Sequence, residues 1–309
     1  MPAGSKPDRK LLNAVLLMTG SALSFALMGA AVKASTREMP FLVSLFFRSV
    51  AGVIPLGIMV LVRQGSFRSG RQLLLFRRSL LGFLAMCLFF LGIERLPLST
   101  AVVLNQSSPV FTVIFSAILL KEHRAVHVLP VALIAFLGVA LLVGPEMASS
   151  GLWVSLTLLS AVLSALAYVT VKQLSATESS PLIVFYFSVW GTLFSIVLIL
   201  VALASGSDYL DWPSIAVHLA DPWTVVVLLC VGMFGIFGQL LMTASYARAR
   251  ASQVSPYSFF NPLFSYVIGV AAFSETVTLY RIMGGALVIA ASVLVPFIGS
   301  RSESSSKRG

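Results

Sequence analysis

Residues 105–122 read NQSSPVFTVIFSAILLKE, and residues 258–275 read SFFNPLFSYVIGVAAFSE. Each stretch has a proline near its start and a glutamate at its end, at the same spacing. A shift of 153 residues superimposes four identical pairs: Gly82 on Gly235, Ser99 on Ser252, Pro109 on Pro262 and Glu122 on Glu275. A shift of 139 relates residues 21–33 to residues 160–172 in the same way. Matches in one order and at a nearly constant offset predict that the chain contains two copies of one structural unit.

The composition places both copies in a membrane. The chain has 309 residues, of which 58% are hydrophobic and 10% charged, and its mean hydropathy is +0.97. A soluble globular chain carries about 25% charged residues. So few charges could not cover the surface of a soluble core, which excludes a soluble enzyme, a nucleic-acid-binding protein and a disordered chain. We therefore expect an integral membrane protein.

Apolar runs between charges and turn residues predict the membrane spans. A helix needs about 20 apolar residues to cross about 30 Å of hydrocarbon. Ten such runs occur, at 11–33, 40–62, 73–94, 98–120, 127–144, 151–172, 181–204, 223–246, 252–273 and 280–298. The longer connections, 63–72 and 205–222, are expected to be loops. The basic start leads into an apolar run that is too long for a cleaved signal peptide.

Spans and repeat together predict an all-α membrane protein with ten transmembrane helices. The first five-helix repeat is expected in residues 1–146, and the second, with a short cytoplasmic tail, in residues 147–309. Because five is an odd number, the two repeats cross the membrane in opposite senses. Inverted repeats of this kind are common in transporters, which bind their substrate near the midplane between the halves.

The positive charges predict the orientation. With the N-terminus in the cytoplasm, sixteen lysines and arginines, Arg77 and Arg78 among them, fall on the inner side and four on the outer side. Cytoplasmic loops carry such an excess of lysine and arginine, so both termini are expected in the cytoplasm, at a cell inner membrane. The net charge of +10 is then a topology signal rather than a sign of a polyanionic partner.

Polar residues inside the spans are the candidate binding residues. The span at 98–120 carries a polar stripe at helical spacing, and the repeat places a second stripe in the span at 252–273. The stripes consist of Asn105, Ser108, Pro109, Thr112 and Ser116, and of Ser258, Asn261, Pro262, Ser265 and Gly269. Interhelical hydrogen bonding is one interpretation. The wall of a central cavity is the other, and we favour it for Asn105 and Asn261 because buried amides are costly to leave unpaired.

Other spans add further candidates. Polar or aromatic positions on faces that could line the same cavity are Tyr168, Trp190, Gln239, Tyr246 and Tyr257. For the aromatic residues, ordinary packing between helices is the alternative.

Arg48 is the one ionisable residue expected inside a span. A charge at that depth is rare and points to a functional site, where the guanidinium fork would suit a substrate carboxylate. The alternatives are that Arg48 extends its side chain to the membrane surface, or that it binds backbone carbonyls of a neighbouring broken helix, such as the span at 98–120 near Pro109. All eleven acidic residues fall in tails, in loops or at span ends, so no carboxylate is expected at the midplane. That disfavours a proton-coupled exporter of cations and favours a neutral, zwitterionic or anionic substrate.

Three motifs resemble one transporter family. Glu122 precedes the apolar run ALIAFLGVALLV at 132–143, Glu275 precedes GGALVIAASVLV at 284–295, and FRSVAG surrounds Arg48. These features are similar to the EamA-type transporters of the drug/metabolite transporter superfamily, and the resemblance covers nearly the whole chain. It implies a ten-helix carrier that exports amino acids or related metabolites, with aromatic amino acid exporters among the bacterial members.

We therefore expect a secondary carrier that exports small organic metabolites, aromatic amino acids included, by alternating access. A nucleotide-sugar or drug carrier of the same superfamily is the nearest alternative, and a non-transporting structural membrane protein stays open. The expected partners are a small-molecule substrate and the lipid bilayer, without nucleic acid. No P-loop, HExxH or GxSxG motif occurs, so we expect no enzyme, no cofactor and no metal site.

Overall fold

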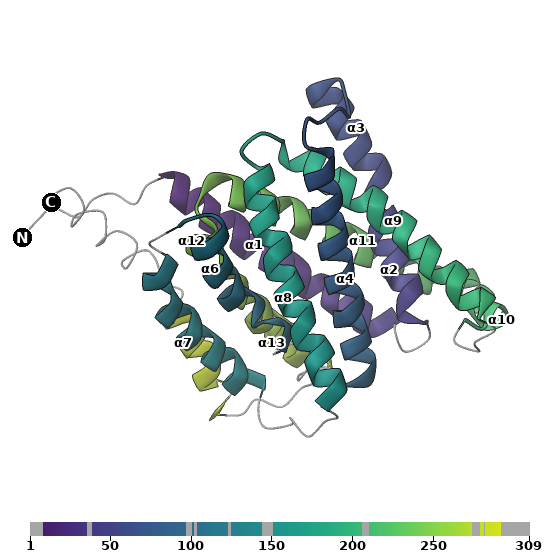
Figure 1. The fold of residues 1–309 in the computed structure, drawn as a ribbon. Helices are drawn as coiled ribbons and strands as arrows, with labels where there is room; N and C mark the ends of the chain where they lie inside the picture. Colours follow the sequence, from purple (N-terminus) through teal and green to yellow (C-terminus); the bar gives the residue numbers. More distant parts are fainter. Residues whose placement is uncertain are drawn as a thin grey trace, which may run out of the picture.

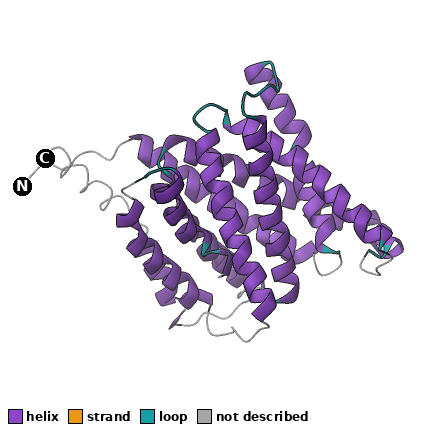
Figure 2. Ribbon diagram, viewed as in Figure 1, coloured by secondary structure: helices purple, strands orange, loops and turns teal. Residues whose placement is uncertain are grey.

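The structure is a computed structural model. It describes residues 9–35, 39–96, 101, 104–122, 125–143, 151–205, 210–273, 279–280 and 282–291. Within these ranges every regular element is a helix and no strand occurs (Figure 2). The expected all-α class is thus confirmed for the part of the chain that the structure describes.

The helices follow the expected spans closely. The first half contains α1 (Arg9–Ser35), α2 (Phe41–Val50), α3 (Val53–Gln64), α4 (Gln72–Arg95), α6 (Ser108–Leu119) and α7 (Ala125–Val143). The second half contains α8 (Gly151–Leu174), α9 (Ser180–Ala204), α10 (Trp212–Ala220), α11 (Pro222–Arg248), α12 (Ala251–Val254), the 3₁₀ helix η1 (Ser255–Phe259) and α13 (Phe260–Phe273). A further apolar helix runs over Ile282–Ala291.

Six helices are long and apolar enough to cross a membrane. These are α1, the joined α2 and α3, α4, α8, α9 and α11. The apolar helices Ser108–Leu119, His127–Leu141 and Ile282–Ala291 are shorter and lie where further spans were expected. The number of ten transmembrane helices therefore stays a prediction.

Helix packing follows the sequence repeat. The two most extensive helix contacts are α1 with α11 and α4 with α8, and α4 and α8 lie side by side in Figure 1. The repeat relates α1 to α8 and α4 to α11, so these two pairs are equivalent. The contacts of α4 with α9 and of α11 with α2 are equivalent in the same way. This packing is consistent with a two-repeat architecture.

Prolines interrupt three of the expected spans. Pro55 has no backbone N–H, and its ring would clash with the carbonyl of Ala51 in a regular helix, so α2 ends at Val50 and α3 begins at Val53. Pro109 lies in the first turn of α6. In the second half, Pro262 follows the change from η1 to α13. Pro109 and Pro262, which the sequence places inside expected spans, thus each lie in the first turn of a helix, whereas the break before Pro55 was not foreseen.

The connection at 205–222 contains a helix that was not expected. Its position as a longer connection between two apolar runs predicted a loop, but α10 forms there. Leu210 and Ile215 are 8% and 2% exposed and pack in one apolar cluster with Met39, Val43 and Leu228. Burial of these apolar side chains favours a helix over a solvated loop.

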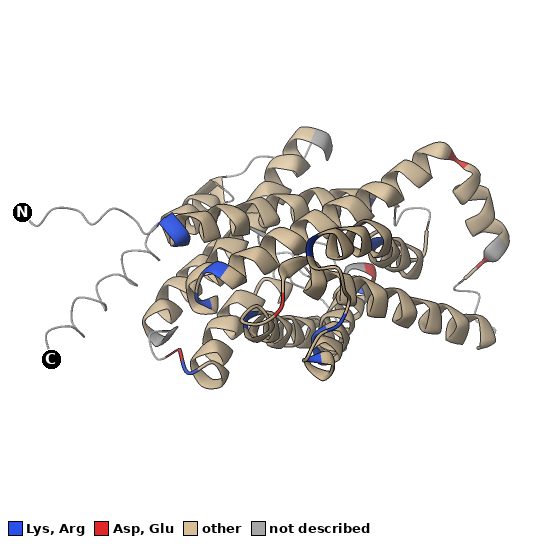
Figure 3. Ribbon diagram, turned by 90° about the horizontal axis from the view of Figure 1, so that it is seen from above, with Lys and Arg blue, Asp and Glu red and all other residues tan. Residues whose placement is uncertain are grey.

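The outer surface of the bundle is apolar. Large hydrophobic side chains are exposed along most helices, including Leu16, Ile54, Val62, Leu73, Ile118, Leu200 and Val226. Figure 3 shows that long stretches of helix carry no lysine, arginine, aspartate or glutamate. An apolar surface of this extent marks contact with lipid. The protein is a multi-pass membrane protein.

Candidate functional site

Arg48 lies inside the bundle, near the end of α2. Its side chain is 8% exposed, and its Cζ atom is 5.2 Å from the ring centroid of Phe187 on α9. Gly235 of α11 lies beside the aliphatic part of the same side chain. Nε is buried and has no hydrogen-bond partner among the described residues. Arg48 thus lies within a candidate membrane span, as expected, and none of the contacts described for it is with the Pro109 region.

Arg78 is a second buried arginine, so the expectation that only Arg48 lies within a span was wrong. It belongs to the second turn of α4, is 2% exposed, and its Cζ atom is 4.3 Å from the centroid of the same Phe187 ring. Its neighbour Arg77 is exposed. Arg78 shares a helix face with the buried Leu75 and with Gly82, three and four residues away. That spacing is the sequence signal that could have identified it.

The two guanidiniums repel each other, and no acid among the described residues neutralises them. Arg48 and Arg78 interact electrostatically, and both guanidiniums lie beside the Phe187 ring. In the described part of the chain, no carboxylate forms an ion pair with either, and Nε and Nη1 of Arg78 have no hydrogen-bond partner. The described carboxylates lie at helix ends and in connections, at Glu94, Glu122, Glu178, Asp211 and Asp221. The centre of the bundle therefore carries an uncompensated positive charge.

Two tyrosines and one glutamine complete this centre. Tyr168 of α8 and Tyr246 of α11 stack with ring centroids 5.8 Å apart. Tyr168 interacts electrostatically with both guanidiniums, and Tyr246 with that of Arg78. Gln239 lies one turn along α11 from Gly235, and its Nε2 is buried without a described partner. Four expected site residues (Arg48, Tyr168, Gln239 and Tyr246) thus belong to one region, which we call the arginine centre together with Arg78 and Phe187.

A second polar group lies where α6 and α13 begin. Asn105 Nδ2 donates to Ser160 Oγ at 3.0 Å, and Gln106 Nε2 donates to Asn261 Oδ1 at 3.2 Å. Asn261 Nδ2 donates to the Ala22 carbonyl at 3.0 Å. The two expected asparagines therefore take part in hydrogen bonds between helices, and both stay half-buried. Gln106, which links the two proline breaks, was missed by the sequence reasoning.

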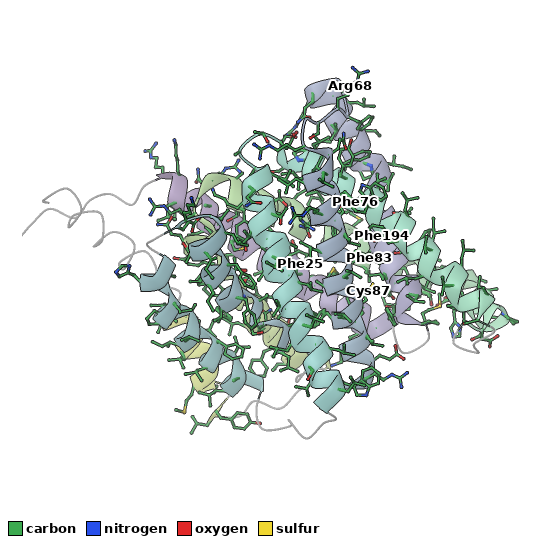
Figure 4. The ribbon with its side chains drawn as sticks, in the orientation of Figure 1. Phe25, Arg68, Phe76, Phe83, Cys87 and Phe194 are labelled. Atoms are coloured by element: carbon green, nitrogen blue, oxygen red, sulfur yellow. The ribbon has the colours of Figure 1, made fainter. Side chains whose placement is uncertain are left out.

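The remaining candidates lie in packed surroundings. Trp190 contacts Phe76 edge-on at 4.8 Å and stacks on Phe194 at 5.7 Å between centroids. Figure 4 shows Phe76, Phe83 and Phe194 gathered between α4 and α9, with Cys87 further along α4, while Phe25 lies apart from them and Arg68 projects from the top. Ser108 and Tyr257 are buried, and the Ser258 hydroxyl donates to the Ser255 carbonyl in its own turn.

An all-helical, lipid-exposed bundle with uncompensated charges at its centre is the architecture of a membrane transporter. The model of the EamA-like transporter family matches the chain twice, at residues 12–144 and 151–297. The chain therefore belongs to the EamA-like transporter family. The resemblance seen in the sequence motifs is confirmed.

Several relatives cover most of the chain. It is 31% identical to the pseudopaline exporter of Pseudomonas aeruginosa (strain UCBPP-PA14), over 92% of this chain and 95% of that protein. It is 22% identical to the S-adenosylmethionine uptake transporter of Rickettsia prowazekii (strain Madrid E), over 87% of each chain. One crystal structure superposes with a TM-score of 0.74 at 17% identity, covering 94% of this chain and 98% of that one, which shows a shared fold. The class of protein is thus a small-molecule transporter of the membrane.

Proposed function

We propose that the chain is a secondary carrier that exports small organic metabolites, amino acids and aromatic ones among them, across a bacterial inner membrane. The observation that carries the proposal is the arginine centre: buried hydrogen-bond donors without partners, deep in a member of a transporter family. Such groups are costly in a lipid-embedded bundle unless a ligand or water satisfies them.

The proposed mechanism is alternating access between two inverted halves, residues 1–146 and 147–309. The equivalence of the α1–α11 and α4–α8 contacts supports it, because either set of contacts could open while the other stays closed. The cavity of this proposal is lined at its centre by Arg48, Tyr168, Gln239 and Tyr246. At the proline breaks its wall is formed by Asn105, Ser108, Tyr257, Ser258 and Asn261. Between α4 and α9 it is formed by Trp190. Both termini are placed in the cytoplasm.

We infer export as the direction of transport. The relatives include one protein named as an exporter and one named as an uptake transporter. Export is favoured by the resemblance to amino acid exporters and by the exporter's higher identity to this chain. No single side chain of the described structure determines the direction.

A nucleotide-sugar or drug carrier of the same superfamily is the second candidate. Positive charge at the centre disfavours cationic drugs, since two unpaired guanidiniums would repel them. An enzymatic role finds no support in the named relatives, which are transporters. In a purely structural membrane protein, unpaired buried charges would lower the stability without a compensating function.

Counterflow in proteoliposomes tests the proposal. Vesicles loaded with an unlabelled amino acid should accumulate the same labelled amino acid only when the carrier is present, with and without a proton gradient. Absence of exchange for every amino acid would contradict the amino acid assignment, and exchange of a nucleotide sugar instead would favour the second candidate.

The two asparagines provide the matching variants. Asn105→Ala and Asn261→Ala remove the hydrogen bonds at the proline breaks, and we expect each to lower the counterflow rate several-fold while folded protein is retained. Ser155→Ala is the control, because Ser155 is exposed on α8 and bonds only within its own helix. Unchanged flux in both asparagine variants would overturn their assignment to the cavity.

A further inference from the structure

We propose that Arg48 and Arg78 together form a site for substrates with two carboxylate groups. The inference rests on the proposed carrier function and narrows its substrate class from amino acids in general to acidic amino acids and related dicarboxylates. Its starting point is the second arginine, which the sequence pattern assigned to the cytoplasmic surface and which the structure places in the interior.

The two guanidiniums reach the centre from opposite ends of the bundle. Arg48 lies about 10 Å along α2 from its first residue, and Arg78 lies about 10 Å along α4 from its first residue, at the other end. Both contact the ring of Phe187, at 5.2 and 4.3 Å. Cation–π contact orients each guanidinium but leaves its N–H groups available for an acceptor.

The unpartnered atoms of this centre are nearly all hydrogen-bond donors. Among the described residues they are Nε of Arg48, Nε and Nη1 of Arg78, and Nε2 of Gln239, and the hydroxyl of Thr243 lies one turn further along α11. Buried polar groups in folded proteins are almost always hydrogen-bonded, so such a set requires an explanation. A ligand rich in acceptors and negatively charged satisfies all of these donors at once.

Charge determines the number of carboxylates. One carboxylate would leave the centre with a net positive charge, because no described acid lies beside it. Two carboxylates can pair with both guanidiniums, and each guanidinium fork can bind a carboxylate through two parallel hydrogen bonds. A dicarboxylate without an amino group balances both charges, whereas the ammonium group of an acidic amino acid leaves one positive charge at the centre. Because the arginines come from different helices, a substrate with two separated acidic groups fits better than one with both charges on a single phosphate.

L-Glutamate and L-glutamine provide the test, because they have nearly the same size and differ by one carboxylate. We expect the purified carrier in nanodiscs to bind glutamate about 10- to 100-fold more tightly than glutamine, the range of one charge-assisted contact. In counterflow, glutamate should exchange faster than glutamine or phenylalanine. Glycerol 3-phosphate serves as the phosphate arm, and tighter binding of it than of glutamate would overturn the carboxylate assignment.

Binding of glutamate and glutamine by arginine variants shows which arginine binds which carboxylate of the substrate. Of Arg48→Gln and Arg78→Gln, we expect one to abolish the preference for glutamate over glutamine and the other to weaken binding of both amino acids. Arg77→Gln is the matched control, since Arg77 is the exposed neighbour of Arg78 and should leave binding unchanged. If a glutamine variant fails to fold, Arg48→Lys or Arg78→Lys keeps the charge without the fork and should weaken binding by a smaller factor.

Stability without ligand distinguishes a binding role from a structural one. Removing an uncompensated buried charge should leave the thermal midpoint of the empty protein unchanged or raise it, whereas the increase on adding glutamate should be lost. Equal binding of glutamate and glutamine by the unmodified carrier would overturn the inference, while exchange of both would still support the amino acid carrier. Absence of exchange for any amino acid would contradict the proposed function itself.

Discussion

Gly82 and Gly235 occupy equivalent positions of the two repeats, and each lies against one of the two buried arginines. A Cβ atom added at Gly82 would overlap Nη1 of Arg78 and come within 3.0 Å of the Phe187 ring. At Gly235 the added atom would be 3.1 Å from Cγ of Arg48 and 3.2 Å from Sδ of Met28. Each half therefore has a glycine that leaves room for a buried arginine. The two arginines both belong to the first half, and the repeat does not relate their positions.

Gly82→Ala should displace the Arg78 guanidinium and lower substrate affinity. The cost of overpacking is typically about 1–3 kcal/mol, and if the bound state bears it, the dissociation constant rises about 5- to 150-fold. Alanine has the higher helix propensity, so α4 itself should fold. Binding to the purified protein measures the effect, and Gly29→Ala is the control because no neighbouring atom lies within 4 Å of its added Cβ. Affinity equal to that of the unmodified protein would show that the space beside Arg78 is not needed.

Four residues of the arginine centre were predicted from the sequence, and Arg78 was not. Arg48, Tyr168, Gln239 and Tyr246 were selected because each is polar or aromatic within an apolar run. Arg78 escaped selection because Arg77 precedes it near a helix end, and two adjacent arginines there are typical of a cytoplasmic boundary. The two arginines differ in the direction that each position takes around the helix axis. Arg78 faces the bundle, and Arg77 faces outward.

Glu122 connects the end of α6 to the start of α12. Its carboxylate accepts hydrogen bonds from the backbone N–H groups of Ala251 and Ser252, at 3.1 and 3.2 Å, and from Ser252 Oγ at 2.6 Å. Lys172 Nζ donates to the carbonyls of Tyr246 and Ala249, where α11 ends. An acid at one helix start and a cation at the preceding helix end complement the two helix dipoles and hold this junction together.

Glu122→Ala should weaken that junction by about 1–2 kcal/mol, the usual loss for a helix N-cap. The thermal midpoint in detergent should fall by a few degrees. Glu122→Gln keeps one acceptor oxygen and Ser252→Ala removes only the hydroxyl contact, so both should fall less. Identical melting curves for the alanine variant and the unmodified protein would rule out a stabilising role for this contact.

The positions of the six long helices were predictable to within a few residues, because a bilayer requires long apolar runs and these have clear ends. Two features of the elements were not predictable from hydropathy. The split between α2 and α3 follows from a proline ring and a backbone carbonyl, which apolarity does not report. The helix α10 is stabilised by Leu210 and Ile215 packing on α2 and α11, which is a tertiary contact between distant parts of the sequence.

The arrangement of the whole molecule follows from its repeat. Helices that the repeat relates form equivalent pairs of contacts. The contact between α2 and α9, which are themselves equivalent, joins the two halves. Close approach there depends on small residues: a Cβ at Gly52 would overlap the Ser188 hydroxyl, and one at Gly191 would lie 2.9 Å from the Ser49 hydroxyl. Small residues at helix crossings are the usual means by which membrane helices approach closely.

Orientation in the membrane is the property of the whole molecule that labelling can test. Ser66 is exposed in the connection between α3 and α4, beside three arginines, so we place it in the cytoplasm. Ala216 is exposed on α10, which lies between Asp211 and Asp221, so we place it outside. Both positions can carry a single cysteine once Cys87 and Cys230, the two free cysteines, are replaced by alanine.

In intact cells, or in spheroplasts where an outer membrane is present, a membrane-impermeant maleimide should label the Ala216→Cys variant at once. The Ser66→Cys variant should react only after the membrane is permeabilised. The opposite pattern would reverse the orientation and would place the arginine-rich connection outside, against the charge distribution of the entire chain. Labelling of both positions in intact cells at equal rates would mean that the chain inserts in both orientations, which an inverted repeat permits and only the asymmetry of its lysines and arginines prevents.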